Sequence, residues 1–290
     1  MTIPKIKTHP EETAQILNKI FIRIQDKTGH DFSAYKKSTI NRRIQKRMKT
    51  CQINEICDYL EYLHENPDEI HLLCNELLIN VTQFFRDPEA YESLKSKFFI
   101  NILEAKDDDV IRIWVPGCSS GEEVYSIAIM ISELFEEMNQ NFKVQIFGTD
   151  IDESVIRKAR SGKYKISANI HYDRLCKYFS KNGDEYTIKN EIREMMIFST
   201  HNVITDPPFT KLDMISCRNL LIYLESFAQK QVISNFVSAL NKDGILFLGP
   251  SENIGNFLDT FQIEDNKWNI FRCANSGRMR VNLKTNFFTQ

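Results

Sequence analysis

Apolar residues recur at helical spacing over roughly the first 100 positions of the chain. Leu17, Ile20 and Ile24 form one such stripe, and similar stripes follow in the segments 38–51, 56–63 and 70–78. Because apolar positions three and four apart fall on one face of an α-helix, this pattern predicts a series of amphipathic helices. Asp87-Pro88-Glu89 is a strong start signal for a further helix. We therefore expect an all-helical N-terminal domain over residues 1–92.

The pattern changes near residue 110, where short runs rich in β-branched and aromatic residues begin to alternate with helical stretches. The strand-like runs are VIRIWV, VQIFGT, LDMISC, ILFLG and KWNIFRC. This alternation predicts an α/β domain over residues 93–274, with a mostly parallel sheet covered on both faces. Residues 176–200 differ, because an Asn-Gly-Asp turn joins short alternating segments, and they predict a small antiparallel β insertion. The polar residues 275–290 are expected to form a surface tail.

Composition and charge narrow the classes of protein that fit. The 290 residues are 42% hydrophobic and carry a net charge of −2, which is typical of an ordinary soluble protein without an overall attraction to nucleic acid. The seven cysteines are scattered and the six histidines lack ligand spacing, so neither a disulfide framework nor a metal site is predicted. No secretory signal is visible at the start of the sequence and no apolar run approaches the ~20 residues of a membrane span, so we expect neither. We expect a cytoplasmic protein.

Candidate chemistry lies at the ends of the first two predicted strands. The first strand ends in PGCSSGEE, whose small residues 117–121 let a ligand approach the backbone. Glu122 and Glu123 would repel a pyrophosphate but suit an ammonium or sulfonium group. Asp150 ends the second strand, where a carboxylate can accept both ribose hydroxyls of an adenosine. The pattern favours S-adenosylmethionine over NAD, although a tight turn followed by acids that complement the helix dipole remains an alternative.

The tetrapeptide Asp206-Pro207-Pro208-Phe209 has the form with which some methyltransferases hold an adenine amino group. That role requires a position directly at the end of the fourth strand, but here the strand LDMISC begins after the tetrapeptide. Arg218 and Asn219 follow the strand instead. We predict that the two prolines make a rigid turn into the strand and that Phe209 packs.

Four segments taken together resemble the CheR family, whose members esterify glutamates of bacterial chemoreceptors with S-adenosylmethionine. They are NVTQFFRDPEAY (80–91), GCSSGEEVYSIA (117–128), GTDIDESVIRKARSGKY (148–164) and CRNLLIYL (217–224), supported by HNV at 201–203 and GPSEN at 249–253. The resemblance implies a helical domain followed by a Rossmann-like class I methyltransferase domain with a three-stranded antiparallel insertion. It also implies that the chain is a protein-glutamate O-methyltransferase that releases S-adenosylhomocysteine.

The resemblance further implies a set of cofactor-site residues: Asn80, Thr82, Arg86, Glu122, Asp150, Asn202, Val203, Arg218 and Asn219. Within that set, Glu122 would hold the methionine end and Asp150 the ribose, while Asn202 and Val203 would contact the adenine. Arg86 and Tyr223 would stand nearest the transferred methyl group as catalytic residues. A glutamate carboxylate is already ionised at pH 7 and needs no general base, but a guanidinium can fork it and fix its direction.

The segment 36–49, KKSTINRRIQKRMK, carries seven basic residues and no acid. Such a run is commonly a solvated helix face. The resemblance instead makes it a docking surface for the acidic helices of a receptor's cytoplasmic region. In receptor-tethered members the insertion binds the receptor's C-terminal peptide, but the turn region SKNGDEYTI is shorter here, which disfavours tethering. The sequence also resembles methyltransferase segments fused to other signalling domains.

Two other functions compete with this interpretation. One is a nucleic-acid amino-methyltransferase that uses Asp206 and the basic helix, which would bind nucleic acid in a salt-sensitive manner. The other is a non-catalytic signalling module that binds S-adenosylmethionine and transfers nothing. Arg86→Ala would leave the signalling of such a module intact.

Overall fold

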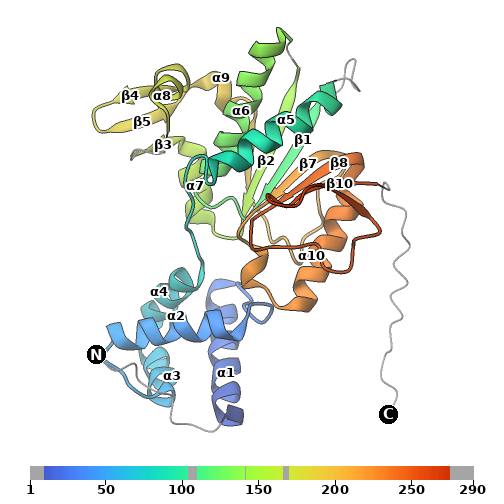
Figure 1. The fold of residues 1–290 in the computed structure, drawn as a ribbon. Coiled ribbons are helices and arrows are strands. Elements are labelled where there is room, and N and C mark those ends of the chain that lie inside the picture. Colours follow the sequence, from blue (N-terminus) through green and yellow to red (C-terminus); the bar gives the residue numbers. More distant parts are fainter. Residues whose placement is uncertain (1–9, 104–109, 141, 166–169, 275–290) are drawn as a thin grey trace. The chain divides into compact units, whose positions relative to one another are not determined.

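The computed structural model describes residues 10–103, 110–140, 142–165 and 170–274 (Figure 1). The chain forms two compact units, one made of residues 1–81 with 220–229 and the other of residues 82–219 with 230–290. The first unit ends at Val81, so residues 82–92 group with the sheet, and the predicted tail lies outside the described residues. In the part of the chain that is described, no helix combines the length and apolarity needed to cross a membrane.

The first unit contains the N-terminal helices that the apolar stripes predict. They are α1 (Pro10–Thr28), α2 (Lys37–Thr50), α3 (Ile56–Glu65) and α4 (Pro67–Leu77). Ile20 and Ile24 of α1 and Ile40 and Ile44 of α2 are fully buried, because residues four apart share a helix face. The all-helical prediction for this part of the chain is confirmed.

The segment 220–229, which interrupts the second unit in sequence, also belongs to the first unit. The 3-10 helix η1 (Leu221–Tyr223) precedes Leu224, which forms an isolated antiparallel bridge with Tyr35. The Lys36 amide donates to the Tyr223 carbonyl at 2.8 Å. A single bridge leaves no periodic signature in the sequence, so the pattern of apolar residues could not predict this pairing.

The second unit is built on a seven-stranded sheet with the order β6-β2-β1-β7-β8-β10-β9. The strands are β1 (Ile111–Pro116), β2 (Val144–Asp150), β6 (Met196–Thr200), β7 (Leu212–Cys217), β8 (Leu240–Leu248), β9 (Phe261–Asp265) and β10 (Ile270–Cys273). All neighbouring strands from β6 to β8 are parallel, whereas β10 lies antiparallel between β8 and β9. The predicted mostly parallel sheet is confirmed.

Four helices of the second unit flank the sheet. They are α5 (Pro88–Leu103), α6 (Glu122–Met138), α7 (Glu153–Ser161) and α10 (Ser226–Ala239), with α5 and α6 packed against each other (Figure 1).

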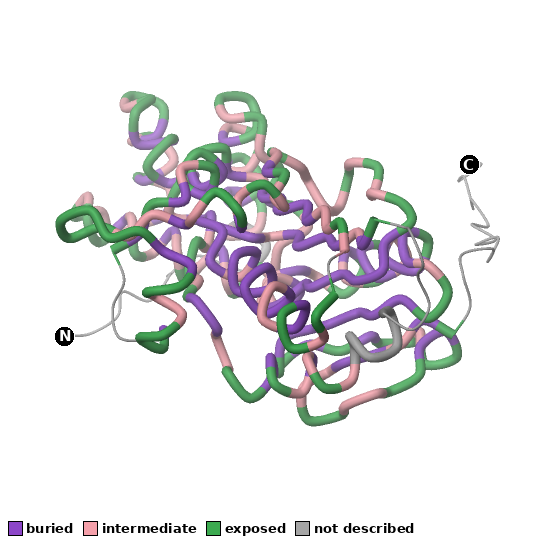
Figure 2. The backbone as a smooth tube through the Cα atoms, turned by 90° about the horizontal axis from the view of Figure 1, so that it is seen from above, coloured by how far each residue is buried: buried purple, intermediate pink, exposed green. Residues whose placement is uncertain are grey.

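Strand β1 is apolar almost throughout because both of its faces are covered by helices. Ile113 joins the core cluster formed with α5 and α6, while the ring of Trp114 lies 5.6 Å from the ring of Phe236 in α10. Successive strand residues point to opposite faces, so both must be apolar. The central strands therefore lie in buried stretches of the backbone (Figure 2).

A second, three-stranded antiparallel sheet has the order β3-β5-β4. It consists of β3 (Lys163–Tyr164), β4 (Phe179–Asn182) and β5 (Glu185–Ile188), flanked by α8 (Tyr172–Tyr178) and α9 (Asn190–Arg193). The predicted antiparallel insertion is confirmed, but the range 176–200 needs correction. Residues 196–200 form β6, which pairs in parallel with β2, while β3 comes from an earlier part of the chain. Short alternating segments do not reveal which sheet a strand will join.

Candidate functional site

The loop that follows β1 has a backbone that few residues can adopt. Gly117, Ser119 and Gly121 have positive φ angles of 66°, 50° and 93°. A Cβ atom at Gly121 would lie 2.8 Å from the Cβ of Ala159 in α7, so both its conformation and the available space require glycine. The Cys118 amide donates to the Thr149 carbonyl at 2.9 Å, which fixes the loop beside the end of β2.

Asp150 is the last residue of β2 and is buried against this loop. Its carboxylate accepts the amides of Ser119 at 2.8 Å and of Asp152 at 3.0 Å. Burial raises the pKa of Asp150 above its ordinary value, although these amide donors oppose the shift. Asp152 in turn caps α7 by accepting the Ser154 amide at 2.8 Å. The carboxylate is thus held in a defined direction at the carboxyl edge of the sheet.

The two acids that begin α6 turn in different directions. Glu122 is buried and accepts the hydroxyl of Ser120 at 2.7 Å, so it stays with its own loop. Glu123 accepts the hydroxyl of Ser216 in β7 at 2.7 Å. Burial raises the pKa of Glu123, and the positive charge of Arg218 is the largest opposing influence. Glu122 was among the predicted site residues, whereas Glu123 appeared in the predictions only as part of the acid pair that would repel a pyrophosphate and suit an ammonium or sulfonium group.

Arg218 follows β7 directly and is buried. Its Nη1 donates to the Arg86 carbonyl at 3.0 Å and its Nη2 to the Asp87 carboxylate at 2.6 Å. The guanidinium carbon lies 4.7 Å from the centre of the Phe247 ring, within reach of a cation–π interaction. Burial would lower the pKa of Arg218, but Glu123 and Asp87 outweigh it and raise the value. Arg218 therefore ties the start of α5 to the end of β7.

Asn219 connects the ends of two parallel strands through an acid to which the sequence analysis gave no role. Its backbone has a φ of 59°, and its amide donates to the Glu252 carboxylate at 2.8 Å. The same carboxylate oxygen accepts the Gly249 amide at 2.7 Å. Glu252 lies in the segment GPSEN that carried part of the family resemblance, so a signal for it was present in the sequence.

Arg86 lies in a strained segment at the start of the second unit, and Thr82 at the head of that segment is half-buried. Phe85 and Asp87 on either side of Arg86 have positive φ angles of 46° and 58°, which non-glycine residues rarely adopt. Burial raises the pKa of Glu123, whereas the positive charges of Arg218 and Arg86 lower it. Both guanidiniums therefore act on that carboxylate. Among the described residues, the Arg86 guanidinium makes no hydrogen bond or ion pair.

Asn202 and Val203 follow β6 and lead into a turn ahead of the tetrapeptide at 206–209. The Asn202 amide donates to the Asp206 carboxylate at 2.8 Å, and the ring of Phe209 stacks on Phe147 with 4.5 Å between centres. Phe209 packs as predicted, but the turn itself lies at residues 203–205, and the tetrapeptide is the irregular segment that leads from it towards β7. Because the Asp206 carboxylate already holds a backbone amide, the geometry argues against the amine-gripping role.

Asn80 and Tyr223 belong to the first unit. Asn80 is exposed in the segment after α4, and Tyr223 ends η1, where its carbonyl accepts the Lys36 amide. Their predicted places in the site, and the catalytic role of Tyr223, stay predictions.

The residues at the carboxyl ends of β1, β2 and β7 fit S-adenosylmethionine. The left-handed loop allows close approach, and the buried hydroxyl oxygen of Ser119 has no hydrogen-bond partner among the described residues. Asp150 would offer a carboxylate to a ribose, and Glu122 and Glu123 would bring negative charge suited to an ammonium or a sulfonium. The sheet is parallel except for β10, which lies antiparallel between β8 and the edge strand β9. This strand order and the acidic loop together define a class I S-adenosylmethionine-dependent methyltransferase.

Comparison with known families agrees with this class. Residues 80–270 match the CheR methyltransferase SAM-binding domain, and residues 15–78 match the CheR methyltransferase all-alpha domain. The chain belongs to the CheR family.

Three relatives illustrate how much of the chain is shared. It is 32% identical over 256 residues to "Chemotaxis protein methyltransferase 2" of Vibrio cholerae, covering 84% of this chain and 88% of that protein. It is 32% identical to "Chemotaxis protein methyltransferase" of Borreliella burgdorferi, covering 83% of this chain and 89% of that protein. A 104.1 kDa protein of Rhodobacter capsulatus is 34% identical over 92% of this chain, but the chain spans only 28% of that protein's length.

Binding of S-adenosylhomocysteine should weaken as the pH falls. Burial raises the pKa of Asp150, so its carboxylate takes up a proton at a higher pH than an exposed aspartate and then loses an acceptor for the ribose hydroxyls. Hydrogen bonds to a charged group are worth about 1.5–3 kcal/mol, so Asp150→Asn should weaken binding about 10- to 100-fold at pH 7.5. Calorimetry between pH 5 and pH 8 checks this. Equal pH dependence in wild type and Asp150→Asn would contradict the assignment.

Proposed function

We propose that the chain transfers the methyl group of S-adenosylmethionine to glutamate side chains of chemoreceptors, the methyl-accepting chemotaxis proteins, in the cytoplasm. The products are glutamate methyl esters and S-adenosylhomocysteine, and the reaction serves adaptation in chemotaxis-like signalling. Family membership and the names of the relatives support this proposal. The observation that carries it is the guanidinium of Arg86. It makes no hydrogen bond or ion pair with a described residue, and its charge opposes the burial that raises the pKa of Glu123 at the start of α6.

The chemistry requires orientation more than proton transfer. When bound, S-adenosylmethionine supplies an electrophilic methyl group on a positively charged sulfur. A glutamate carboxylate is ionised at pH 7 and is its own nucleophile. Arg86 forks this carboxylate and directs one oxygen along the line of transfer, and loss of water from that oxygen raises its reactivity. Glu123 offsets part of the Arg86 charge, so the arginine positions the carboxylate without quenching it. The Tyr223 hydroxyl is proposed to orient the substrate or the cofactor.

The basic helix α2 has fewer available charges than its sequence suggests. Arg47 pairs with Glu69 at 2.6 Å, and Arg43 and Lys46 both pair with Glu76, at 2.8 and 2.9 Å. These acids lie on α4, so much of the positive charge stabilises the helical unit itself.

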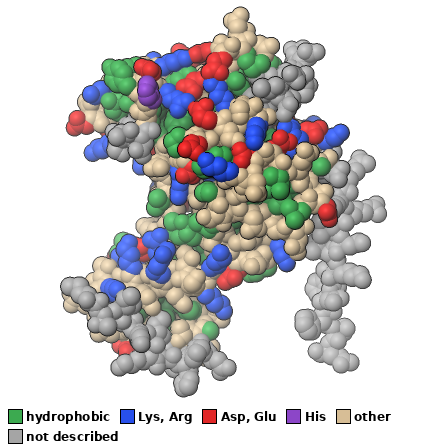
Figure 3. Space-filling model, viewed as in Figure 1, with side chains coloured by type: hydrophobic (Ala, Val, Ile, Leu, Met, Phe, Trp, Pro, Cys, Tyr) green, Lys and Arg blue, Asp and Glu red, His purple; other side chains and the backbone are tan. Residues whose placement is uncertain are grey.

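A positive surface still remains on α2. It surrounds a hollow of about 390 Å³ lined by Arg42, Arg43, Gln45, Lys46 and Lys49, and Figure 3 shows Lys and Arg side chains gathered over the helical unit. Within the described part of the chain, Arg42 and Lys49 form no ion pair. We propose that this hollow receives the acidic face of a receptor helix and that the attraction weakens in salt.

A methyl-transfer assay tests the proposed reaction. The protein is mixed with labelled S-adenosylmethionine and a receptor cytoplasmic fragment, and label that is released by base is counted. We expect base-labile label that disappears when the acceptor glutamates are changed to glutamine. Binding of S-adenosylhomocysteine without any labile ester would overturn the proposal in favour of a non-catalytic sensor.

Reversing two charges on α2 should weaken docking without changing the chemistry. Arg42→Glu combined with Lys49→Glu is expected to raise the KM for the receptor fragment about tenfold at low salt, because steering by surface charges depends on ionic strength. The kcat should stay within about twofold, and the KM difference should shrink at high salt. Lys19→Glu with Lys27→Glu on α1 makes the same change in net charge and is the matched control. Equal KM increases in both double variants would contradict a specific docking surface.

A further inference from the structure

The backbone around Arg86 is held in a conformation that it would not adopt alone. Phe85 and Asp87 are both left-handed, with φ angles of 46° and 58°. Such conformations persist only where the surrounding structure enforces them. Arg218 holds the Arg86 carbonyl and the Asp87 carboxylate, as described above. The position of the Arg86 guanidinium therefore depends on how firmly Phe85 is held on the other side.

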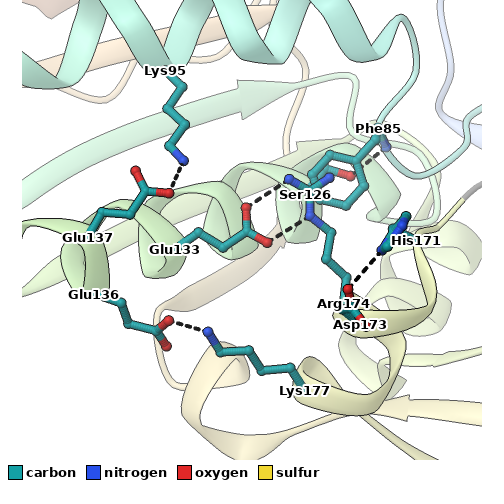
Figure 4. Close-up of polar contacts among 10 residues, drawn as sticks. All are labelled: Phe85, Lys95, Ser126, Glu133, Glu136, Glu137, His171, Asp173, Arg174 and Lys177. Atoms are coloured by element: carbon teal, nitrogen blue, oxygen red, sulfur yellow. Dashed lines mark hydrogen bonds and ion pairs between the residues drawn. The ribbon is translucent and has the colours of Figure 1, made fainter.

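Phe85 is held at its amide by Ser126 of α6 and at its ring by Arg174 of α8. Its amide donates to the Ser126 hydroxyl of α6 at 2.9 Å, and that hydroxyl donates to the Glu122 carbonyl at 2.7 Å. Its buried ring lies under the guanidinium of Arg174, whose central carbon is 4.1 Å from the ring centre. Figure 4 shows Arg174 between this ring and Glu133.

Arg174 is itself fixed by a two-pronged ion pair. Its Nε and Nη2 donate to the two carboxylate oxygens of Glu133 at 2.7 and 2.8 Å. Glu133 lies seven residues after Ser126 on α6, so both project from the same side of that helix. Burial would lower the pKa of Arg174, but Glu133 outweighs it and raises the value, so the guanidinium stays charged. The two parallel hydrogen bonds fix the plane of the guanidinium, and the guanidinium in turn restrains the Phe85 ring on which it lies.

We propose that Arg174, oriented by Glu133, is a positioning residue for Arg86 in methyl transfer. Arg174 lies on α8, which directly precedes β4 of the antiparallel insertion. Among the described residues, it contacts the segment 82–90 through Phe85. The insertion therefore contributes to the direction from which Arg86 meets the acceptor carboxylate. This inference rests on the proposed role of Arg86.

A neighbouring ion pair on the same two helices provides a matched control. Lys177, one turn further along α8, pairs with Glu136 of α6 (Figure 4). It joins the insertion to α6 as Arg174 does, but it makes no contact with Phe85 among the described residues. If Arg174 served only to attach α8 to α6, Lys177→Ala and Arg174→Ala should have similar effects.

The test compares Arg174→Ala, Arg174→Lys and Lys177→Ala in the full chain. Lysine can pair with Glu133, but its ammonium is not planar and cannot stack on the Phe85 ring. Both Arg174 variants should therefore lower kcat about 10- to 100-fold, as expected when a catalytic group is misplaced. The Kd for S-adenosylhomocysteine should change less than about twofold, because the described contacts of Arg174 are with Glu133 and Phe85 and not with the loop that follows β1. Lys177→Ala should keep wild-type kcat. Full activity in Arg174→Lys, or equal losses in Arg174→Ala and Lys177→Ala, would overturn the inference.

Hydrogen exchange separates this inference from the proposed reaction. We expect amides in residues 82–90 to exchange about tenfold faster in Arg174→Ala and Arg174→Lys, and at the wild-type rate in Lys177→Ala. If the wild type forms no ester but this difference appears, the proposed reaction fails and the positioning of the segment stands. If all variants exchange at the wild-type rate, the positioning role is wrong whatever the enzyme methylates.

Discussion

Replacing Arg86 with alanine should lower kcat for methyl transfer to a receptor glutamate by about 100- to 1,000-fold, the loss that follows removal of one well-placed hydrogen-bond donor in other enzymes. The arginine is expected to fork the attacking carboxylate, and without it the correct line of approach is reached only rarely. Folding should be nearly unaffected, because the guanidinium has no hydrogen bond among the described residues. The carbonyl that accepts Arg218 belongs to the backbone and is retained in the variant. Single-turnover kinetics with saturating cofactor measures the effect.

Two further variants make this result specific. Arg86→Lys keeps the charge but not the fork, so its kcat should fall between those of wild type and Arg86→Ala. Arg157→Ala removes an exposed arginine of α7 that pairs with Glu153 and should leave kcat unchanged. An Arg86→Ala enzyme with normal kcat and a raised KM would mean that Arg86 only binds the acceptor.

Replacing Arg218 with alanine should have the second-largest effect. We expect it to lower the free energy of unfolding more than it changes any single kinetic step. The variant loses the ion pair with Asp87 and the hydrogen bond to Arg86, and it leaves Glu123 without the main charge that opposes its burial. Breaking a fully buried pair by removing one partner costs about 3–5 kcal/mol, and Asp87 is 35% exposed here, so this figure is an upper bound. We expect a loss of unfolding free energy of up to that size in denaturant titration, together with weaker binding of S-adenosylhomocysteine.

Arg272 is the matched control for this loss. It donates to Glu264 at 2.6 Å and joins β10 to the edge strand β9, with side chains that are 14% and 20% exposed. Both side chains reach solvent, so removing Arg272 leaves no fully buried charge, and Arg272→Ala should lose less unfolding free energy than Arg218→Ala. Comparable losses in both variants would show that Arg218 is an ordinary ion-pair partner and not the link between the start of α5 and the end of β7.

Local patterns predicted much of the second unit. The run EEVYSIAIMISELFEEM is α6 from its first residue to its last, and Gly162 ends α7 in a left-handed conformation, as the pattern indicated. These features depend on side-chain periodicity and backbone sterics within a few residues, which a sequence displays directly. The segment 196–200 was assigned to the wrong sheet, because its own residues allow a strand but do not choose its partner.

Some residues of the candidate site could be identified from the sequence and others could not. The glycine loop and Asp150 were identifiable from sequence, since each must follow a strand at the carboxyl edge where ligands bind. The roles of Glu123, Ser216 and Glu252 were not, because their contacts join β7 to α6 and to the end of β8 across long stretches of chain. The sequence by itself determined the order of helices and strands, the type of cofactor and the family. The tertiary structure decided which acids face which cations and what holds Arg86, because these depend on distances between residues far apart in the chain.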